Sequence, residues 1–359
     1  MKIAILGTRG IPNYYGGFEQ FAQYLSVGLV ESGHEVFVYN SSNHPFQSNT
    51  YKGVKIIHCF DPEYKIGTIG QFVYDLNCIL DSRKRNYDVV LQLGYTSSSI
   101  FNFLFGNVRI VTNMDGLEWK RTKYSRPVQS FLKYAEKIAV KRSHSLIADS
   151  IGIKRYLDEK YKVDSVYIPY GADLNQLPEK KFLDDFKLTE YKYDMLIARM
   201  EPENSVSQIV NGFVRSSTNR KLVIVGNTNT KMGQKLKFIN DKRLIFLEYI
   251  SDINCLNSLR FYSNIYFHGH TVGGTNPSLL EAMASQALIC AHDNIFNKSI
   301  LQKDGLFFKT EFDVKRIVET IQKNDYSSFI NANKHKIGTT FSWKKIIKQY
   351  EIELKKNLI

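Results

Sequence analysis

The chain has 359 residues, of which 43% are hydrophobic, and its 48 Lys and Arg residues oppose 35 Asp and Glu residues, for a net charge of +13. This length suits two domains with buried cores, and the basic balance favours an anionic partner such as a nucleotide, an anionic lipid or a nucleic acid. No stretch reaches the about 18 uninterrupted apolar residues of a membrane-spanning helix, so no such helix is expected.

Four cysteines stand far apart in apolar surroundings and without metal-ligand spacing, at positions 59, 78, 255 and 290. We therefore expect buried, reduced thiols in a cytoplasmic protein. The apolar run at the N-terminus, MKIAIL, is too short for a signal peptide.

Strand and helix patterns alternate through the first half of the chain. Strands are predicted at Lys2–Leu6, Glu35–Tyr39, Val54–His58, Asp88–Leu93, Arg109–Asn113, Ser145–Ala148 and Ser165–Ile168. Helices are predicted at Gly17–Ser32, Ile69–Arg85, Pro127–Arg142 and Ile151–Lys160. Several strands are short apolar runs without alternation, which is typical of a doubly wound parallel sheet covered on both faces.

The second half restarts the same pattern. Strands are predicted at Tyr193–Ala198, Leu222–Val225, Leu244–Leu247, Ile265–His268 and Ala287–Ala291. Helices are predicted at Asn204–Ser216, Lys231–Asn240, Ile253–Phe261, Pro277–Ser285, Asp313–Lys323 and Ser342–Leu358. The pattern predicts an α/β protein with two doubly wound, Rossmann-like domains that face a central cleft, with ligands at the carboxyl ends of the strands.

The domain boundaries follow from this rhythm. We expect an N-terminal domain over 1–172, a linker over 173–192 and a second domain over 193–340. The last segment, 341–359, is amphipathic and is expected to be a structural helix.

The segment HTVGGTNPSLLEAMA at 270–284 combines a Gly-rich turn with a helix start. Asn276 suits the N-cap and Pro277 suits the first helical position. Free N–H groups and the helix dipole favour a phosphate at such a helix start, and Glu281, about one turn further, would accept hydrogen bonds from a sugar. The alternative is a capped core helix with a solvated Glu281.

A second Gly-rich segment, GTRGIPNYYGGFE at 7–19, follows the first strand. Gly16 and Gly17 allow a ligand to approach the backbone, and Arg9 follows the carboxyl end of the strand, where an anion would bind. The glycine spacing departs from the GxGxxG of dinucleotide-binding loops. The alternative is a mobile turn.

A third segment, ARMEPEN at 198–204, follows the first strand of the second half. The guanidinium of Arg199 can bind phosphate oxygens in a bidentate manner. The alternative is a surface ion pair of Arg199 with Glu201 or Glu203.

Four motifs in this order resemble the retaining glycosyltransferases of family 4, which have the GT-B fold: YGGFE at 15–19, IPYGAD at 168–173, RMEPEN at 199–204 and GTNPSLLEAMA at 274–284. The resemblance covers essentially the whole chain. The opening GTRGIPNYYGGFEQFA and NMDGLEWKR at 113–121 look most like the bacterial rhamnosyltransferase branch. This branch implies transfer of L-rhamnose from dTDP-rhamnose, with a UDP-sugar as the next candidate, to a lipid-linked saccharide in cell-surface polysaccharide synthesis.

The resemblance also assigns roles to residues. Arg199 would grip the donor diphosphate and assist catalysis, and Glu281 would bind the ribose hydroxyls. The backbone of two turns would approach the diphosphate and the sugar, at Gly16, Gly17, Gly274, Thr275 and Asn276. By the same resemblance, the C-terminal helix crosses back to brace the N-terminal domain.

The chain departs from the family at three positions. The family usually has a second diphosphate-binding cation, a Lys, where Asn204 stands. At about 4 Å and an effective dielectric of 20, losing that cation removes several kcal/mol of attraction, and Arg9 is the candidate replacement by position. The first Glu of the family's glutamate pair falls at Gly273, so that a carboxylate contact to the transferred sugar is absent or is replaced by backbone.

The third departure is Asp115, which aligns with the family's catalytic His. In the predicted cleft it would orient the acceptor hydroxyl or accept its proton. The alternative is an Asx-turn before Gly116. By resemblance, the configuration of the sugar would be retained through front-face attack. No metal or other cofactor is expected, because no DxD-like carboxylate pair follows a strand.

The segment Trp119–Arg142 mixes cations with aromatic residues: Lys120, Arg121, Lys123, Arg126, Lys133, Lys137, Lys141 and Arg142 with Trp119, Tyr124, Phe131 and Tyr134. It suits an anionic membrane surface, at the inner face of the plasma membrane, or a lipid-diphosphate acceptor. The alternative is an ordinary solvated helix face.

Three rival classes share some of these features. A nicotinamide-dependent oxidoreductase would need GxGxxG and an acidic ribose partner after the second strand, which ends in Tyr39 and Asn40. A nucleic-acid binder would need a recognition motif, and the cations are spread over both halves, so no nucleic-acid partner is expected. A GT-B sugar-nucleotide epimerase shares the fold and the donor but acts without an acceptor.

Overall fold

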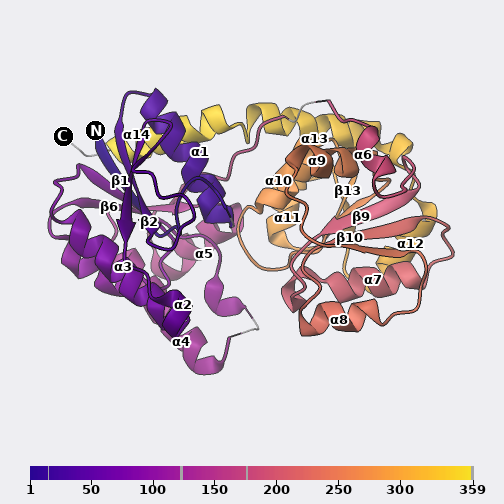
Figure 1. Cartoon of the computed structure of the whole chain (residues 1–359), viewed down its shortest axis with the longest axis horizontal. Coiled ribbons are helices and arrows are strands. Elements are labelled where there is room, and N and C mark those ends of the chain that lie inside the picture. Colours follow the sequence, from indigo (N-terminus) through magenta and orange to yellow (C-terminus); the bar gives the residue numbers. More distant parts are fainter. Residues whose placement is uncertain (15, 122–123, 175–176, 357–359) are drawn as a thin grey trace. The chain divides into compact units, whose positions relative to one another are not determined.

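The structure is a computed structural model that describes residues 1–14, 16–121, 124–174 and 177–356. The chain forms two compact α/β units, each with its own sheet (Figure 1). The N-terminal unit combines Met1–Tyr170 with Trp343–Ile359, and the C-terminal unit contains Gly171–Ser342.

Eight strands form the sheet of the N-terminal unit, in the order β3-β4-β2-β1-β5-β6-β7-β8. All neighbours pair in parallel except β3 with β4. The bounds are β1 Lys2–Leu6, β2 Glu35–Ser41, β3 Thr50–Tyr51, β4 Val54–Cys59, β5 Val89–Leu93, β6 Arg109–Asn113, β7 Ser145–Ala148 and β8 Val166–Tyr167. In the central strand β1, Ile3 pairs with Val36 on one side and Val89 on the other. Both β5 and β6 are buried throughout, as expected for strands covered on both faces.

Helices cover both faces of this sheet (Figure 1). The bounds are α1 Gly17–Glu31, α2 Glu63–Ile66, α3 Ile69–Ser82, α4 Arg126–Arg142, α5 Ile151–Tyr161 and α14 Trp343–Lys355, with short 3-10 helices η1 Ser99–Phe105 and η2 Glu118–Lys120. The helix α1 packs along α14, whereas α3, η1 and α4 pack against one another. Apolar side chains of β1, β2 and α3, including Leu6, Tyr39 and Ile79, form one buried cluster of the core.

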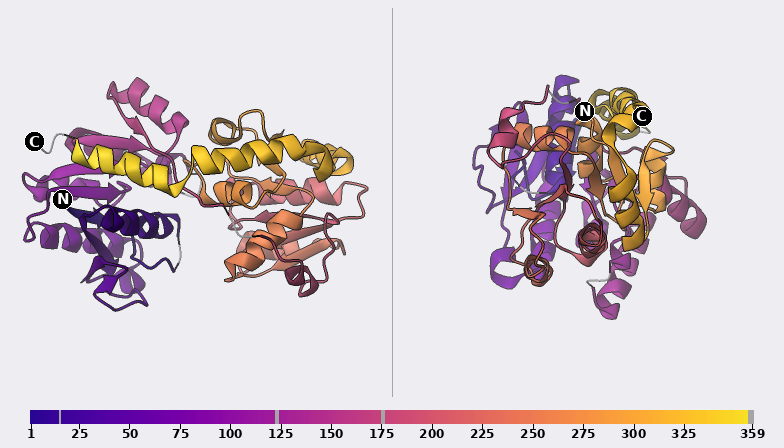
Figure 2. Two further views of the ribbon diagram at one scale, coloured as in Figure 1. Left: turned by 90° about the horizontal axis from the view of Figure 1, so that it is seen from above. Right: turned by 90° about the vertical axis from the view of Figure 1, so that its right-hand side faces the viewer.

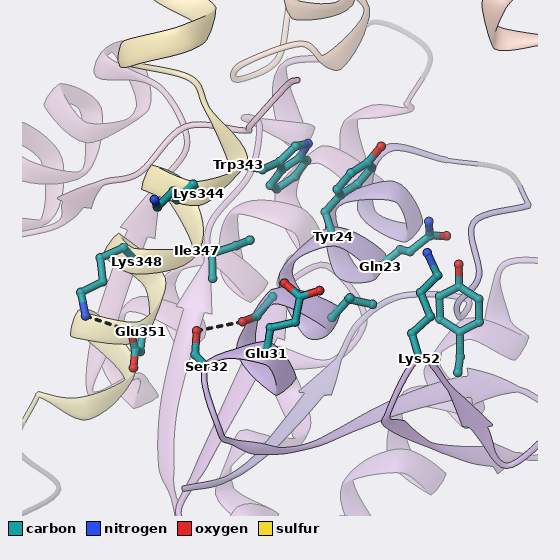
Figure 3. Close-up of a pocket in the computed structure, with 13 residues that line it drawn as sticks. Gln23, Tyr24, Glu31, Ser32, Lys52, Trp343, Lys344, Ile347, Lys348 and Glu351 are labelled. Carbon is teal, nitrogen blue, oxygen red and sulfur yellow. Dashed lines mark hydrogen bonds and ion pairs between the residues drawn. The ribbon is translucent and has the colours of Figure 1, made fainter. Parts of the chain in front are cut away.

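The last helix, α14, belongs to the N-terminal unit and lies along it (Figure 2). The ring of Trp343 stacks on Tyr24 of α1, with centroids 4.6 Å apart and an interplanar angle of 1° (Figure 3). Glu351, one turn before the end of α14, has its Oε1 atom 3.1 Å from His34 Nε2. Of the predicted helix over 342–358, residues 357 and 358 lie outside the described part of the chain.

Six parallel strands form the sheet of the C-terminal unit, in the order β11-β10-β9-β12-β13-β14. The strand bounds are β9 Tyr193–Ile197, β10 Lys221–Val225, β11 Leu244–Leu247, β12 Tyr266–His268, β13 Ile289–His292 and β14 Leu306–Phe308. The helices are α6 Lys181–Asp184, α7 Val206–Val214, α8 Lys231–Lys237, α9 Ile253–Tyr262, α10 Pro277–Ala284, α11 Ile295–Leu301, α12 Glu311–Thr320 and α13 Ser327–Thr339, with 3-10 helices η3 Pro202–Asn204 and η4 Lys323–Tyr326. The strands β9, β10 and β12 bury Leu196, Ile224 and Phe267 in a core shared with α7 and α12.

Every strand and helix predicted from the sequence is present, with ends that differ by a few residues. Six strands and α-helices of the described structure were not predicted: β3, β14, α2, α6, α11 and α13. The run Leu306–Phe308 has only three residues and becomes the strand β14 by pairing with β13. The buried residues of α13 are Asn333 and Ile337, and so polar a segment shows no clear apolar stripe.

The segment predicted as a linker, 173–192, falls within the C-terminal unit. It contains the short helix α6, which packs on α9. The backbone N–H of Glu179 donates to Ser258 Oγ at 3.1 Å, and the N–H of Tyr191 donates to the carbonyl of Tyr262 at 2.8 Å. Residues 175 and 176 of this segment lie outside the described residues.

The predicted state of the cysteines agrees with the structure, since all four thiols are buried and none forms a disulfide. Among the described helices, none is both long enough and apolar enough to cross a membrane. In the same part of the chain, no three His, Cys, Asp or Glu side chains are grouped as a metal ion would need.

Gly7 should be among the least replaceable residues of the N-terminal unit. It turns the chain after β1 at φ +88°, and a Cβ there would lie 2.2 Å from the carbonyl oxygen of Leu93. Gly33 has a similar φ of +83° but has open space around the position of a Cβ. We expect Gly7→Ala to cost roughly 2–4 kcal/mol of stability and Gly33→Ala only about 1 kcal/mol, as measured by urea unfolding. Equal costs would show that backbone strain alone, rather than the close contact with β5, makes Gly7 necessary.

Candidate functional site

The Gly-rich segment after β1 is held in place by side chains from two other elements. Asn40, at the end of β2, binds both backbone groups of Ile11, its Oδ1 accepting from the N–H at 3.0 Å and its Nδ2 donating to the carbonyl at 2.8 Å. Glu19 Oε1 accepts from the backbone N–H of Arg9 at 2.9 Å. These bonds fix residues 9–11 and argue against a mobile turn at that part of the segment.

Glu19 is a residue whose role the sequence analysis missed, although it ends the YGGFE motif. It is buried, and burial raises the pKa of its carboxyl against the lowering effect of the Arg9 N–H. The start of α1 depends on the absence of a side chain at Gly16, because a Cβ there would lie 2.0 Å from Glu19 Oε2. Gly16 and Gly17 are exposed, as backbone contact with a ligand requires, whereas Tyr15 lies outside the described residues.

Arg9 is surrounded by acidic side chains. Its Nη2 lies 2.5 Å from Glu63 Oε2 and its Nη1 lies 3.8 Å from Asp61 Oδ2. The guanidinium also stands 5.6 Å from the centroid of the Tyr74 ring. A diphosphate would have to compete with these carboxylates for Arg9, so the predicted replacement of the missing cation gains no support from the geometry.

Asp115 follows β6 in a left-handed conformation, with φ +45°. Its backbone N–H donates to Asn113 Oδ1 at 2.9 Å, so that Asn113 forms the side-chain turn at this point. Burial raises the pKa of the Asp115 carboxyl to about 6, with a further contribution from Glu118, while Arg121 lowers it. The backbone N–H of Gly116 also lowers the pKa of the Asp115 carboxyl, a contact that the Asx-turn alternative requires, so the catalytic role of Asp115 stays a prediction.

The loop after Asp115 is anchored by a buried carboxylate, Glu136 of α4, which the sequence analysis did not single out. Glu136 Oε2 accepts from Trp119 Nε1 at 3.1 Å, which fixes η2 against α4. Its other oxygen accepts from Tyr156, Lys160 and Tyr161 of α5 at 2.7, 2.9 and 2.6 Å. Such a network ties the backbone after Asp115 to two helices.

In the C-terminal unit, the side chain of Arg199 is 56% exposed just beyond β9. Its closest ion-pair contact, Nη2 to Glu201 Oε2, is 4.0 Å long, and exposed pairs of this kind contribute about 0–1 kcal/mol. Asn204 is buried, and its Nδ2 donates to the carbonyl of Arg199 at 2.8 Å. Asn204 therefore fixes the backbone that presents Arg199, while its predicted direct contact with a donor stays a prediction.

The Arg199 loop and the start of α10 lie side by side. The backbone N–H of Thr271 donates to the carbonyl of Glu203 at 2.9 Å, and a Cβ on Gly269 would lie 2.0 Å from the carbonyl oxygen of Asn204. Residues 199–204 and 269–276, which the sequence analysis treated as separate motifs, therefore form one surface at the carboxyl ends of β9 and β12.

The predicted start of α10 is confirmed in detail. Asn276 is the N-cap, with its side chain accepting from the N–H of Ser278 at 3.0 Å, and Pro277 occupies the first turn. Gly273 has φ +133°, a conformation that favours glycine, and its neighbour Gly274 is partly exposed whereas Thr275 is buried. The helix start thus presents the amide-rich turn that binds anions in other proteins.

Glu281 is held by a buried arginine that the sequence analysis did not identify. Arg260 of α9 is 1% exposed, and its Nη2 lies 2.6 Å from Glu281 Oε2. Arg260 Nη1 also donates to Asn257 Oδ1 at 3.0 Å. The side chain of Glu281 is 25% exposed and is paired with a buried arginine, rather than being the free solvated carboxylate of the alternative interpretation, and its contact with a ribose stays a prediction.

The raised pKa of Asp115 predicts a pH-dependent effect on stability. A carboxyl whose pKa rises from 3.8 to about 6 on folding favours the folded state below pH 3.8, and this contribution is lost as the pH rises through 6. Asp115→Asn removes the buried charge and tolerates the left-handed backbone. We expect it to stabilise the protein at pH 8 relative to wild type, but not at pH 4, in thermal unfolding. Equal shifts at the two pH values would show that Asp115 does not carry a raised pKa.

Comparisons with known proteins agree with this architecture. Residues 1–173 match the family model of a domain of unknown function, DUF1972. No curated protein sequence matches the chain.

Several solved structures resemble the whole chain. Sucrose-phosphate synthase of Thermosynechococcus elongatus has a TM-score of 0.78 at 14% identity over 98% of each chain. HepE of Anabaena, in complex with UDP and glucose, has a TM-score of 0.77 at 15% identity over 99% of each chain. A glycosyltransferase from Rickettsia africae has a TM-score of 0.71 at 18% identity over 99% of each chain. These similarities confirm the predicted fold class, an α/β protein with two Rossmann-like domains of the GT-B type.

Proposed function

We propose that this chain is a glycosyltransferase of the GT-B type that uses a nucleotide sugar as its donor. The observation that carries the proposal is the joint surface of 199–204 and 269–276, where an exposed Arg199 stands on a fixed loop next to the capped start of α10. The solved HepE structure, which contains UDP and glucose, supports a nucleotide-sugar donor for this fold.

On this proposal the donor diphosphate binds Arg199 and the backbone N–H groups around Gly274, Thr275 and Asn276. A guanidinium and the positive end of a helix dipole both favour the charge of a diphosphate. The ribose hydroxyls bind Glu281, whose carboxylate is oriented by Arg260. The motif resemblance assigns Gly16 and Gly17 to the donor as well.

The proposed reaction forms a bond from the acceptor oxygen to the anomeric carbon while the bond from that carbon to the diphosphate oxygen breaks. Arg199 and the α10 amides stabilise the charge that grows on the leaving diphosphate. Asp115, with a pKa of about 6, is mostly ionised at pH 7 and orients the acceptor hydroxyl. Retention of configuration then follows from front-face attack, with the acceptor proton passing to the leaving phosphate.

The finer assignment is retaining family 4, rhamnosyltransferase branch, with dTDP-rhamnose as donor and a UDP-sugar as the next candidate. A lipid-linked saccharide in bacterial cell-surface polysaccharide synthesis is the proposed acceptor, at the cytoplasmic face of the plasma membrane. The support is the motif resemblance, above all NMDGLEWKR at 113–121. Thermal stabilisation by a panel of nucleotide sugars tests it, and preference for a non-rhamnosyl donor would overturn the rhamnose assignment.

Arg199 should discriminate between nucleotides by their phosphates. We expect Arg199→Ala to weaken binding of the preferred nucleoside diphosphate roughly 10- to 100-fold, because charge-assisted hydrogen bonds are lost, while nucleoside binding stays unchanged. Arg215→Ala is the matched control, since Arg215 is also 56% exposed and pairs with Glu311 in the same unit. Isothermal titration calorimetry with the nucleoside and its diphosphate measures both effects. Equal losses in the two variants would remove Arg199 from the donor site.

Glu281 should discriminate between nucleotides by their ribose hydroxyls. Glu281→Ala would leave the buried Arg260 without its charged partner and would destabilise the protein, so Glu281→Gln is the informative variant. Its amide oxygen still accepts from Arg260, but the charge that strengthens hydrogen bonds to hydroxyls is gone. We expect Glu281→Gln to bind the preferred nucleoside diphosphate about tenfold more weakly, and its dideoxyribose analogue as wild type does. If both ligands lose affinity equally, Glu281 does not contact the ribose.

A further inference from the structure

The outer face of α4 carries only positive charge. Five of its residues are exposed cations: Arg126, Lys133, Lys137, Lys141 and Arg142. Its one acidic residue, Glu136, is buried on the opposite side and pairs with Lys160 at 2.9 Å. Among the described residues, no carboxylate lies within ion-pair distance of Lys137, Lys141 or Arg142. This face therefore has charge that the rest of the unit does not neutralise.

A hollow of about 440 Å³ lies between α4 and η1 at this face. Three cations line one part of it, Lys137, Lys141 and Arg142, and its other lining residues are Ile100, Phe103, Tyr134 and Ile138. Phe103 and Tyr134 are 61% and 60% exposed, and both line the same hollow. Cations beside exposed aromatic groups match an amphiphile with a phosphate head and an apolar body.

Another hollow of the N-terminal unit, which is larger than the hollow beside α4, does not share this character. It lies between α1 and α14, measures about 900 Å³, and is lined by both signs of charge (Figure 3). Lys348 there lies 3.2 Å from Glu351, and Glu31 faces the same space as Lys52 and Lys344. The hollow beside α4 thus differs from the hollow between α1 and α14, because only cations among the charged residues line it.

We propose that the α4 face, defined as Phe103, Tyr134, Lys137, Lys141 and Arg142, docks on an anionic phospholipid bilayer. The three cations bind lipid phosphates, and the aromatic rings enter the zone between head groups and acyl chains. This proposal rests on the proposed function, which places a lipid-linked acceptor at a membrane, and it adds the surface by which the protein would reach that membrane. Its test needs neither donor nor acceptor.

The test is co-sedimentation of the full chain with vesicles of phosphatidylcholine mixed with phosphatidylglycerol, and with vesicles of phosphatidylcholine alone. We expect binding to the mixed vesicles only, weakened by salt. Lys137→Glu/Lys141→Glu should lower the vesicle affinity by roughly 25-fold or more, at about fivefold for each cation removed. The matched control is Lys52→Glu/Lys344→Glu, which changes the net charge of the same unit equally and should leave the affinity within about twofold.

The apolar part of the α4 face has its own control. Phe103→Ala should weaken binding to the mixed vesicles, whereas Phe238→Ala, at a phenylalanine that is 87% exposed in the C-terminal unit, should not. Equal losses in the two charge variants would mean a general charge effect and would overturn the proposal. Binding of glycerol phosphate without binding of vesicles would overturn it too, in favour of a soluble phosphate ligand.

Nucleotide binding separates this proposal from the proposed function. Lys137→Glu/Lys141→Glu should keep the wild-type thermal stabilisation by the preferred nucleoside diphosphate. If wild type binds nucleotide but not vesicles, the docking face fails and the donor site stands. If it binds vesicles but no nucleotide, the donor site fails and the docking face stands.

Discussion

The close contact between two loops at the carboxyl edge of the C-terminal sheet is the constraint on which the candidate donor site depends. Because β9 and β12 are neighbours, the chain leaves both strands at the same edge. Gly269 can approach the carbonyl of Asn204 only because it lacks a Cβ, and Asn204 in turn binds the carbonyl of Arg199. The exposed guanidinium of Arg199 therefore stands on backbone that the sheet itself positions.

Buried ionic networks also fix the orientation of carboxylates and of the loops that these carboxylates contact. Glu281 is oriented by Arg260 from the neighbouring helix, and Glu136 accepts from five donors, one of which, Trp119, belongs to the loop after Asp115. Such networks cost desolvation energy, so they are weak evidence for stability, but they leave few orientations to the groups they hold. In both units a functional candidate is exposed or strained, while the residues that fix it are buried.

Motif and periodicity were enough to locate most of this candidate site along the chain. The cap at Asn276 and the first-turn Pro277 follow local rules for helix starts, which act over a few residues and so can be read without knowing the fold. Most strands of both sheets follow from short apolar runs for the same reason, but β3 and β14 do not. The ion-pair partners of Glu281 and Arg9 could not be predicted in this way, because they lie far away along the chain. Arg260 is 21 residues from Glu281, and Glu63, which pairs with Arg9, is 54 residues from it.

By itself, the sequence determined the class of fold, the succession of elements and the positions of the Gly-rich turns, because hydrophobic period and turn chemistry are local properties. Only the tertiary structure decided which side chains are available. It placed Arg9 between carboxylates, buried Asn204 beneath the Arg199 loop and paired Glu281 with a buried arginine. In α4, the tertiary structure buries Glu136 and leaves the cations exposed, because the packing of the helix, and not its composition, decides which side faces the core. Contacts between residues far apart in the chain set burial and charge pairing, and these in turn decide what a side chain can bind.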